Sequence, residues 1–143
     1  MFKNILVPIH LEYKKNHKKL FEGAFNVLNK ENGKITLFNV NENSVHPEID
    51  IMFDENQQIE YELNALKELK EIAEYYSLPI DKISFMVKDG VVHQEILKQA
   101  EKMKADAIVM MATKPGVSSY FISSTAERVV RHTDCSIFII RLK

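Results

Sequence analysis

Residues 106–132, DAIVMMATKPGVSSYFISSTAERVVRH, and residues 137–140, IFII, are the part of the chain that decides the fold. The first stretch reads as a buried strand, a loop of small residues and a helix, and the second reads as a final strand. In an open α/β sheet this arrangement builds a crevice beside a helix N-terminus, where anions bind. We therefore expect any small-molecule site to lie in this stretch.

The composition indicates one globular domain, residues 1–143. A chain of 143 residues, 45% of them hydrophobic, can bury one core and is too short for two ordinary domains. Its 19 basic and 20 acidic residues nearly balance, so no overall field favours nucleic acid. Its one cysteine cannot form an intrachain disulfide, and there is no signal-peptide pattern and no apolar run of about 20 residues. We expect a cytoplasmic protein with no membrane or nucleic-acid partner.

Apolar patterning alternates between strands and helices along the whole chain. Short apolar or β-branched runs predict strands at 5–9, 34–40, 82–87, 107–112 and 137–140. Helical spacing is found at 14–30, at 58–78, from Ile96 to Met103 and at 124–131, with Gly33 as the first helix stop and Leu78-Pro79 as the second. Residues 41–57 lack both patterns and predict an exposed loop placed to cover the crevice. The order predicts an α/β fold, a single doubly wound parallel sheet with helices on both faces.

Ligands of such a sheet bind beyond the carboxyl ends of the strands, where the strand order reverses. The helix that begins at Ser124 adds backbone N–H groups and hydroxyls, which suit a phosphate. The expected contact residues are Pro8, Ile9, His10, Val40, Met110, Met111, Ala112, Thr113, Lys114, Ser123, Ser124 and Thr125. A helix cap alone explains the serines equally well, because Ser124-Thr-Ala-Glu127 fits a capping box. Both interpretations stay open.

Three segments resemble the universal stress protein family: Ile5-Leu-Val-Pro-Ile9, Gly90 before the third helix, and residues 124–141, STAERVVRHTDCSIFIIR. The resemblance covers essentially the whole chain. It implies a five-stranded parallel sheet in the order 3-2-1-4-5 and a homodimer made through the C-terminal strand, residues 136–142. The apolar edge of that strand independently favours pairing with a second copy, since a bare edge strand is prone to aggregate.

The same resemblance implies an adenine nucleotide, ATP or AMP, with Mg²⁺ accompanying ATP. In ATP-binding members an aspartate ends the first strand, a valine follows the second, and a glycine loop holds the phosphates. This chain has His10 at the aspartate position, Val40 at the valine, and Met110, Thr113 and Ser123 at the three glycines. Glycine permits close backbone approach, whereas methionine and threonine add bulk. The resemblance therefore predicts a regulatory protein that binds nucleotide in an altered loop.

The remaining reactive side chains form no catalytic or metal-binding pattern. His17, His46, His93 and His132 lack ligand spacing, and surface or capping roles suffice for them. Cys135 has no partner cysteine and no nearby base in a motif, so we expect a small buried hydrophobe. Without paired carboxylates or a P-loop pattern, a hydrolase or transferase is the weakest alternative, and we expect no enzyme. A nucleotide-free dimeric scaffold is the stronger alternative, because all three loop glycines are replaced.

Overall fold

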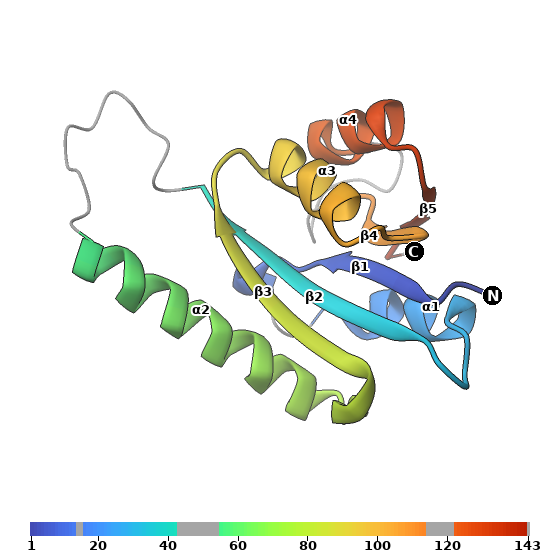
Figure 1. Cartoon of the computed structure of the whole chain (residues 1–143), viewed down its shortest axis with the longest axis horizontal. Helices are drawn as coiled ribbons and strands as arrows, with labels where there is room; N and C mark the ends of the chain where they lie inside the picture. The colour runs from blue at the N-terminus through green and yellow to red at the C-terminus, as the bar shows by residue number, and fades with distance from the viewer. Residues whose placement is uncertain (14–15, 43–54, 114–121, 143) are drawn as a thin grey trace.

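The computed structural model describes residues 1–13, 16–42, 55–113 and 122–142. In these residues five parallel strands form one sheet in the order β3-β2-β1-β4-β5 (Figure 1). The strands are β1 (Asn4–Pro8), β2 (Lys34–Asn41), β3 (Ile83–Asp89), β4 (Ala107–Met111) and β5 (Ser136–Ile140). The helices are α1 (Lys18–Val27), α2 (Glu55–Tyr75), α3 (Val92–Lys102) and α4 (Ser124–His132), with short 3-10 turns η1 (Leu11–Tyr13) and η3 (Ile80–Lys82). The predicted α/β fold and strand order are confirmed.

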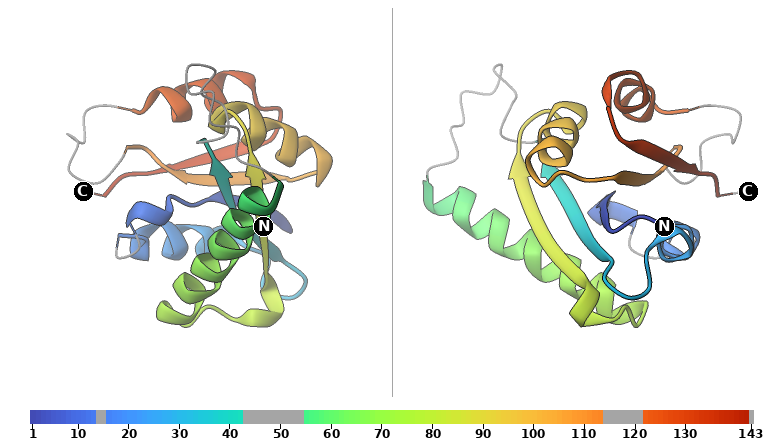
Figure 2. Two further views of the ribbon diagram at one scale, coloured as in Figure 1. Left: turned by 90° about the vertical axis from the view of Figure 1, so that its left-hand side faces the viewer. Right: turned by 45° about the vertical axis from the view of Figure 1, so that its right-hand side comes forward.

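The sheet is covered on both faces, and its middle strand is buried on both. Helices α1 and α2 pack on one face, and α3 and α4 pack on the other (Figure 1 and Figure 2). Along β1, Ile5 and Val7 join the core under α1 and α2, Leu6 joins the core under α3 and α4, and all three are fully buried. A strand buried on both faces is a continuous apolar run, which explains the strong strand signal of residues 5–9. Among the described helices, none has an apolar stretch long enough to cross a bilayer.

The first helix is shorter than predicted at both ends. It begins at Lys18, with His17 at its N-cap position, instead of at residue 14. It ends at Val27 because Leu28 takes an extended backbone conformation and forms a bridge with Phe2. The apolar spacing continues past Val27, but this tertiary pairing overrides it.

The prediction that Gly33 stops the first helix is wrong. Gly33 is part of the turn before β2. Its N–H donates to the carbonyl of Asn29 at 3.0 Å, and a Cβ at this position would overlap the same carbonyl. Only glycine therefore fits this turn without a shift of the backbone.

Helix α2 starts earlier than predicted and is terminated by a backbone motif. Of the loop expected at residues 41–57, Asn41 is the last residue of β2 and residues 55–57 are helical. Residues 43–54 of that expected loop lie outside the described residues. Ser77, with φ of 53°, follows α2, and Lys104, with φ of 54°, follows α3. After Ser77 the Leu78 N–H donates to the Ala73 carbonyl, and after Lys104 the Ala105 N–H donates to the Ala100 carbonyl, each at 2.9 Å. This bond, between residues five apart, is typical of the Schellman cap. The α2 helix has thus ended before Pro79 acts on it.

Helix α4 is capped by Ser123 and not by Ser124. The Ser123 Oγ accepts the N–H of Ala126 at 3.1 Å, and Ser124 is the first helical residue. The Ser123 N–H also donates to the Ala112 carbonyl at 2.8 Å, which anchors the cap to the end of β4. The predicted capping box is therefore wrong by one position, and the Glu127 carboxylate pairs instead with the arginine one turn later, at 2.9 Å.

At the amino edge of the sheet, Asp106 ties β1 to β4. Its two carboxylate oxygens accept the N–H groups of Lys3 and Asn4, each at 2.8 Å. The Asp106 N–H donates to the Asn4 carbonyl at 2.9 Å, and the Asn4 side chain donates to the carbonyl of Met103. These bonds hold the two strands together where they begin.

We predict that Asp106→Ala lowers the free energy of unfolding by about 1–2 kcal/mol, because it removes a charged acceptor of two hydrogen bonds at a solvated site. Urea unfolding measures the change. Asp134→Ala is the matched control, since Asp134 is an exposed carboxylate that borders the same surface pocket as Asp106. We expect the control to change stability by less than about 0.5 kcal/mol. Equal losses of unfolding free energy in the two variants would contradict the proposed role of Asp106 in holding β1 to β4.

The cap assignment is tested by two neighbouring substitutions. Ser123→Ala should cost about 1 kcal/mol of stability, because it removes the acceptor for a helix N–H. Ser124→Ala should be neutral or slightly stabilising, because alanine is the better helix former. Thermal unfolding of both variants gives the ranking, and the opposite ranking would restore Ser124 as the cap.

Candidate functional site

The carboxyl ends of β1, β2 and β4 meet α4 at one edge of the sheet, where a small cavity lies. The volume of this cavity is about 40 Å³. Six predicted contact residues line it, Pro8, Ile9, His10, Val40, Met110 and Thr125, together with Phe38, Asn39, Glu42, Val92 and Ile96. We call this group of eleven residues the crevice.

The other predicted contact residues lie beside the crevice without lining it. Met111 and Ala112 are buried at 6% and 2% exposure, and Met111 belongs to the core on the α1 side of the sheet. Thr113 is half-buried, Ser124 is exposed, and Ser123 is half-buried as the cap of α4. Lys114 lies outside the described residues. The structure thus brings together the strand ends and Thr125 but not the serines.

Asn39 is a crevice residue that the sequence pattern did not single out. It is 8% exposed, and its Nδ2 donates to the carbonyl of Ile9 at 3.0 Å. The N–H of Ile9 donates to the carbonyl of Phe38 at 2.8 Å, so two bonds hold the end of β1 against β2. An asparagine within the apolar run Leu37-Phe-Asn-Val40, close to the carboxyl end of the strand, was the available signal. Val92 and Ile96 were missed because only the packing of α3 over β2 brings them here.

The start of α4 makes one end of the crevice attractive to anions. The first turn of a helix has backbone N–H groups without intrahelical acceptors. In α4 these include the N–H groups of Ser124 and Thr125, because the first backbone bond of the helix runs from the Glu127 N–H to the Ser123 carbonyl. These groups and the helix dipole favour a negative charge. At the other end lies His10, which is half-buried and carries an imidazole, a group that can donate and accept hydrogen bonds.

The crevice is small for a nucleotide. Its volume of about 40 Å³ is well below the roughly 300–1,000 Å³ of usual ligand pockets. The side chain of Met110, which is 4% exposed, fills the position where the family resemblance implies a glycine. A whole nucleotide does not fit the described crevice unless side chains that line it move aside.

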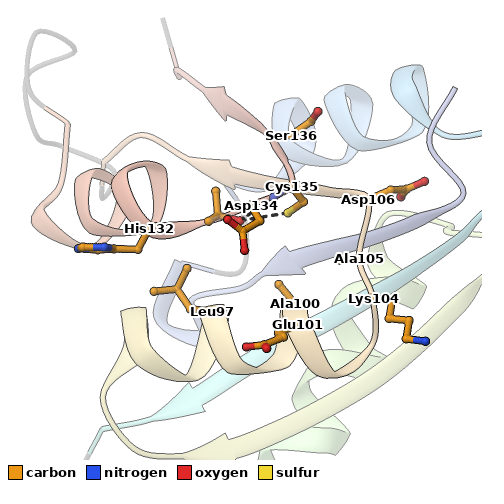
Figure 3. Close-up of a pocket in the computed structure, with 11 residues that line it drawn as sticks. Leu97, Ala100, Glu101, Lys104, Ala105, Asp106, His132, Asp134, Cys135 and Ser136 are labelled. Carbon is orange, nitrogen blue, oxygen red and sulfur yellow. Dashed lines mark hydrogen bonds between the residues drawn. The ribbon is translucent and has the colours of Figure 1, made fainter.

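A larger hollow of about 500 Å³ lies at the opposite edge, between the C-terminal ends of α3 and α4 (Figure 3). Cys135 borders it and is half-buried, not fully buried as predicted. Its Sγ lies 3.1 Å from Thr133 Oγ1, and His132 points away from the thiol (Figure 3). Asp106 is already bonded to the backbone of β1. These groups form no nucleophile with an adjacent base, so the hollow is not a candidate active site.

The histidines do not form a metal site in the described part of the chain, where no three His, Cys, Asp or Glu side chains converge suitably. On α3, partial burial lowers the pKa of His93, and the charges of Arg128 and His132 act in the same direction. His17 contradicts the predicted surface or capping role, because it is fully buried and its side chain makes no cap hydrogen bond. His46 lies outside the described residues.

Two sequence relatives illustrate what the chain is similar to. Universal stress protein MJ0531 of Methanocaldococcus jannaschii is 38% identical over 78 residues, which are 54% of this chain and 44% of that protein. The chain thus spans less than half the length of this relative. Universal stress protein G of Escherichia coli O157:H7 is 24% identical over 144 residues, which cover 99% of this chain and all of that protein.

Solved structures share the fold at low sequence identity. Universal stress protein UspA from Lactobacillus plantarum aligns with a TM-score of 0.74 and 22% identity over 97% of both chains. A universal stress protein in complex with cAMP has a TM-score of 0.65 and 14% identity, covering 99% of this chain and 98% of the other. A family protein from Arabidopsis thaliana with AMP bound has a TM-score of 0.61 and 15% identity, covering 97% and 91%.

The family itself is shown by a match that covers nearly the whole sequence. The family model described as Universal stress protein family matches residues 1–141, which include all five strands and all four helices described above. The sheet order is the one that this family's resemblance implied. This chain belongs to the universal stress protein family.

Proposed function

We propose that this protein binds an adenine nucleotide, ATP or AMP, in the crevice and acts as a regulator in a stress response and not as an enzyme. The observation that carries the proposal is the meeting of three strand ends with the N-terminus of α4 around one cavity. Fold relatives with cAMP and with AMP bound support the choice of an adenine nucleotide. The proposal also includes a single domain, residues 1–143, a cytoplasmic location and a homodimer.

The nucleotide would use the two ends of the crevice differently. Its phosphate would lie at the N–H groups of Ser124 and Thr125, with Mg²⁺ accompanying ATP through the phosphates. Its nucleoside would lie between the ends of β1 and β2, beside Val40. His10 would replace the carboxylate that accepts from a ribose, and a neutral imidazole has one acceptor nitrogen where a carboxylate has two oxygens. We therefore expect binding weaker than a carboxylate at this position would support.

A nucleotide-free dimeric scaffold is the second candidate function. The small volume of the crevice favours it, since Met110 occupies space that a phosphate loop would need. In this alternative the fold persists as a surface for partner proteins. The two candidates differ in one measurable property, the affinity of the crevice for ATP or AMP.

We predict that millimolar ATP with Mg²⁺, or AMP, raises the midpoint of thermal unfolding of the full chain. At a hundred times Kd, mass action adds about 2.7 kcal/mol to stability. Thr125→Trp, which fills the crevice, should abolish the shift. Glu101→Trp is the matched control, because it places the same bulk on an exposed helix residue at the opposite edge and should keep the shift. The absence of any shift, together with nucleotide-free purified protein by mass spectrometry, would favour the scaffold.

The proposed homodimer forms through residues 136–142, where β5 is an edge strand that pairs only with β4 in the described sheet. The carbonyl of Ile140 faces β4, since it accepts the N–H of Ala112 at 2.9 Å. Backbone groups alternate in direction along a strand, so those of Ile137 and Ile139 face outward. These outward groups are the ones that a strand of a second copy would bond.

We predict a particle of twice the 16.6 kDa chain mass in light scattering at micromolar concentration. Ile139→Pro should give a monomer, because proline removes an outward N–H that a partner strand needs and no bond to β4 is lost. Ile139→Val keeps the N–H and most of the packing, and should remain dimeric. Circular dichroism of both variants verifies that they fold. A monomeric wild-type protein at high micromolar concentration would refute the dimer.

A further inference from the structure

His17 is a fully buried polar residue in the connection between β1 and α1. Its exposure is 0%, and its ring lies against two aromatic rings, with centroids 5.8 Å from Phe21 and 6.5 Å from Tyr76. Phe21 and Tyr76 also contact each other edge to face at 5.2 Å. We call the surroundings of the His17 ring that these two rings form the aromatic pocket. It joins the start of α1 to the residue that follows α2, on the face of the sheet opposite α3 and α4.

The polar atoms of the His17 ring are poorly satisfied in this pocket. Within the described residues, neither Nδ1 nor Nε2 has a hydrogen-bond partner of good geometry. Burial is the main cause that lowers the pKa of His17 to about 4. A hydrogen-bonding interaction with the backbone of His10 raises the pKa, and the charge of the His10 imidazole lowers it further. The site therefore favours a neutral ring and resists a proton.

The titratable groups around His17 offer no compensating anion in the described structure. The His10 imidazole acts on the pKa of His17, and the Tyr76 phenol bonds its backbone N–H. The described charged side chains of the adjoining elements are Glu12 on η1 and Lys18 and Lys19 on α1. Glu12 is exposed, and no carboxylate contributes to the pKa of His17. The two lysines are exposed, and the Lys19 ammonium donates to the carbonyl of Leu142 at 3.0 Å.

The start of α1 depends on the burial of His17. Its side chain makes no cap hydrogen bond, so the first turn lacks the usual side-chain acceptor. The backbone of His17 is engaged on both sides: its N–H donates to the Tyr76 hydroxyl at 3.1 Å, and its carbonyl accepts the N–H of Phe21 at 3.0 Å. If the ring leaves the aromatic pocket, both bonds are disturbed together. Proteins open locally as well as globally, and the first turn of α1 is the unit that the loss of these two bonds would open.

We propose that His17 is an acid-responsive latch for the first turn of α1. While neutral, the ring holds this turn closed; once protonated, it leaves the aromatic pocket and the turn opens. The His17 ring lies against the backbone of His10, which lines the crevice, so the opening reaches the candidate ligand site. The latch needs no bound nucleotide, and it stands or falls independently of the proposed function.

The direction and size of the response follow from the two protonation equilibria. The pKa is 6.5 for an exposed histidine and about 4 for the buried ring. Above pH 6.5 both forms are neutral and the latch has its full strength. As the pH falls from 6.5 towards 4, the open form binds a proton that the closed form does not, so the open-to-closed ratio rises about tenfold per pH unit. From pH 7.5 to pH 5.0 the total rise is roughly 30-fold.

Amide hydrogen exchange of the ligand-free full chain at pH 7.5 and pH 5.0 tests the latch, with rates corrected for the intrinsic pH dependence of exchange. The reporter is the N–H of Phe21, which is bonded to the His17 carbonyl. Its protection should fall roughly 30-fold at pH 5.0. The amides of Ile5, Leu6 and Val7 in β1 are the internal reference and should keep their protection. An equal loss in β1 would overturn the latch, because protonation would then act on global unfolding.

Two histidine variants separate His17 from the other titrating groups. His17→Phe fills the aromatic pocket without a titratable group and should reduce the pH response of the Phe21 amide to less than about threefold. His132→Phe alters an exposed histidine on α4 and should keep the full response. A full response in His17→Phe would overturn the proposal. If that variant fails to fold, the ring signals of wild-type His17 decide: a midpoint near pH 4 supports the latch, and a midpoint near 6.5 overturns it.

Discussion

The central constraint on this structure is the burial of β1 on both faces, between β2 and β4. Ile5, Leu6 and Val7 are completely shielded from water and alternate between the two cores. A strand in this position needs a helical layer on each side, because any bare face would expose these side chains. The arrangement of α1 and α2 on one face and α3 and α4 on the other meets that need. The positions of the strand-end residues of the crevice depend on it, since they stand at the ends of β1 and its neighbours.

The elements could be predicted from local patterning, but their ends and their order could not. An apolar run such as Ile5, Leu6 and Val7 is enough to predict a buried strand. The strand order 3-2-1-4-5 was implied only by the family resemblance. Leu28 shows why helix ends are harder: its spacing fits α1, yet pairing with Phe2 draws it out of the helix. At α4 two adjacent serines were equally suitable caps, and the bond from Ser123 to the Ala112 carbonyl selects between them.

The candidate site was only partly predictable for the same physical reason. The rule for strand ends identified His10, Val40 and Met110, because their place depends on topology alone. The volume between them depends on side chains from several elements, including Val92 on α3, and no local pattern contains that information. His17 is the extreme case, since its burial requires Tyr76, which lies 59 residues further along the chain. Long-range packing decides both the size of the crevice and the protonation of this histidine.

The separation of the two sheet edges has a consequence for how such a protein diverges. The link from Asp106 to β1, the tight turn at Gly33 and the cap at Lys104 all lie at the amino edge. Residues at the carboxyl edge that belong to neither hydrophobic core, such as His10 and Thr113, lie outside that framework. Their substitution leaves both cores and the bonds of the amino edge in place. Met110 is different, because it is 4% exposed and part of the core under α3 and α4, so a glycine there would leave a cavity. The ligand contacts of this domain can therefore diverge independently of the fold only where they are not also core residues.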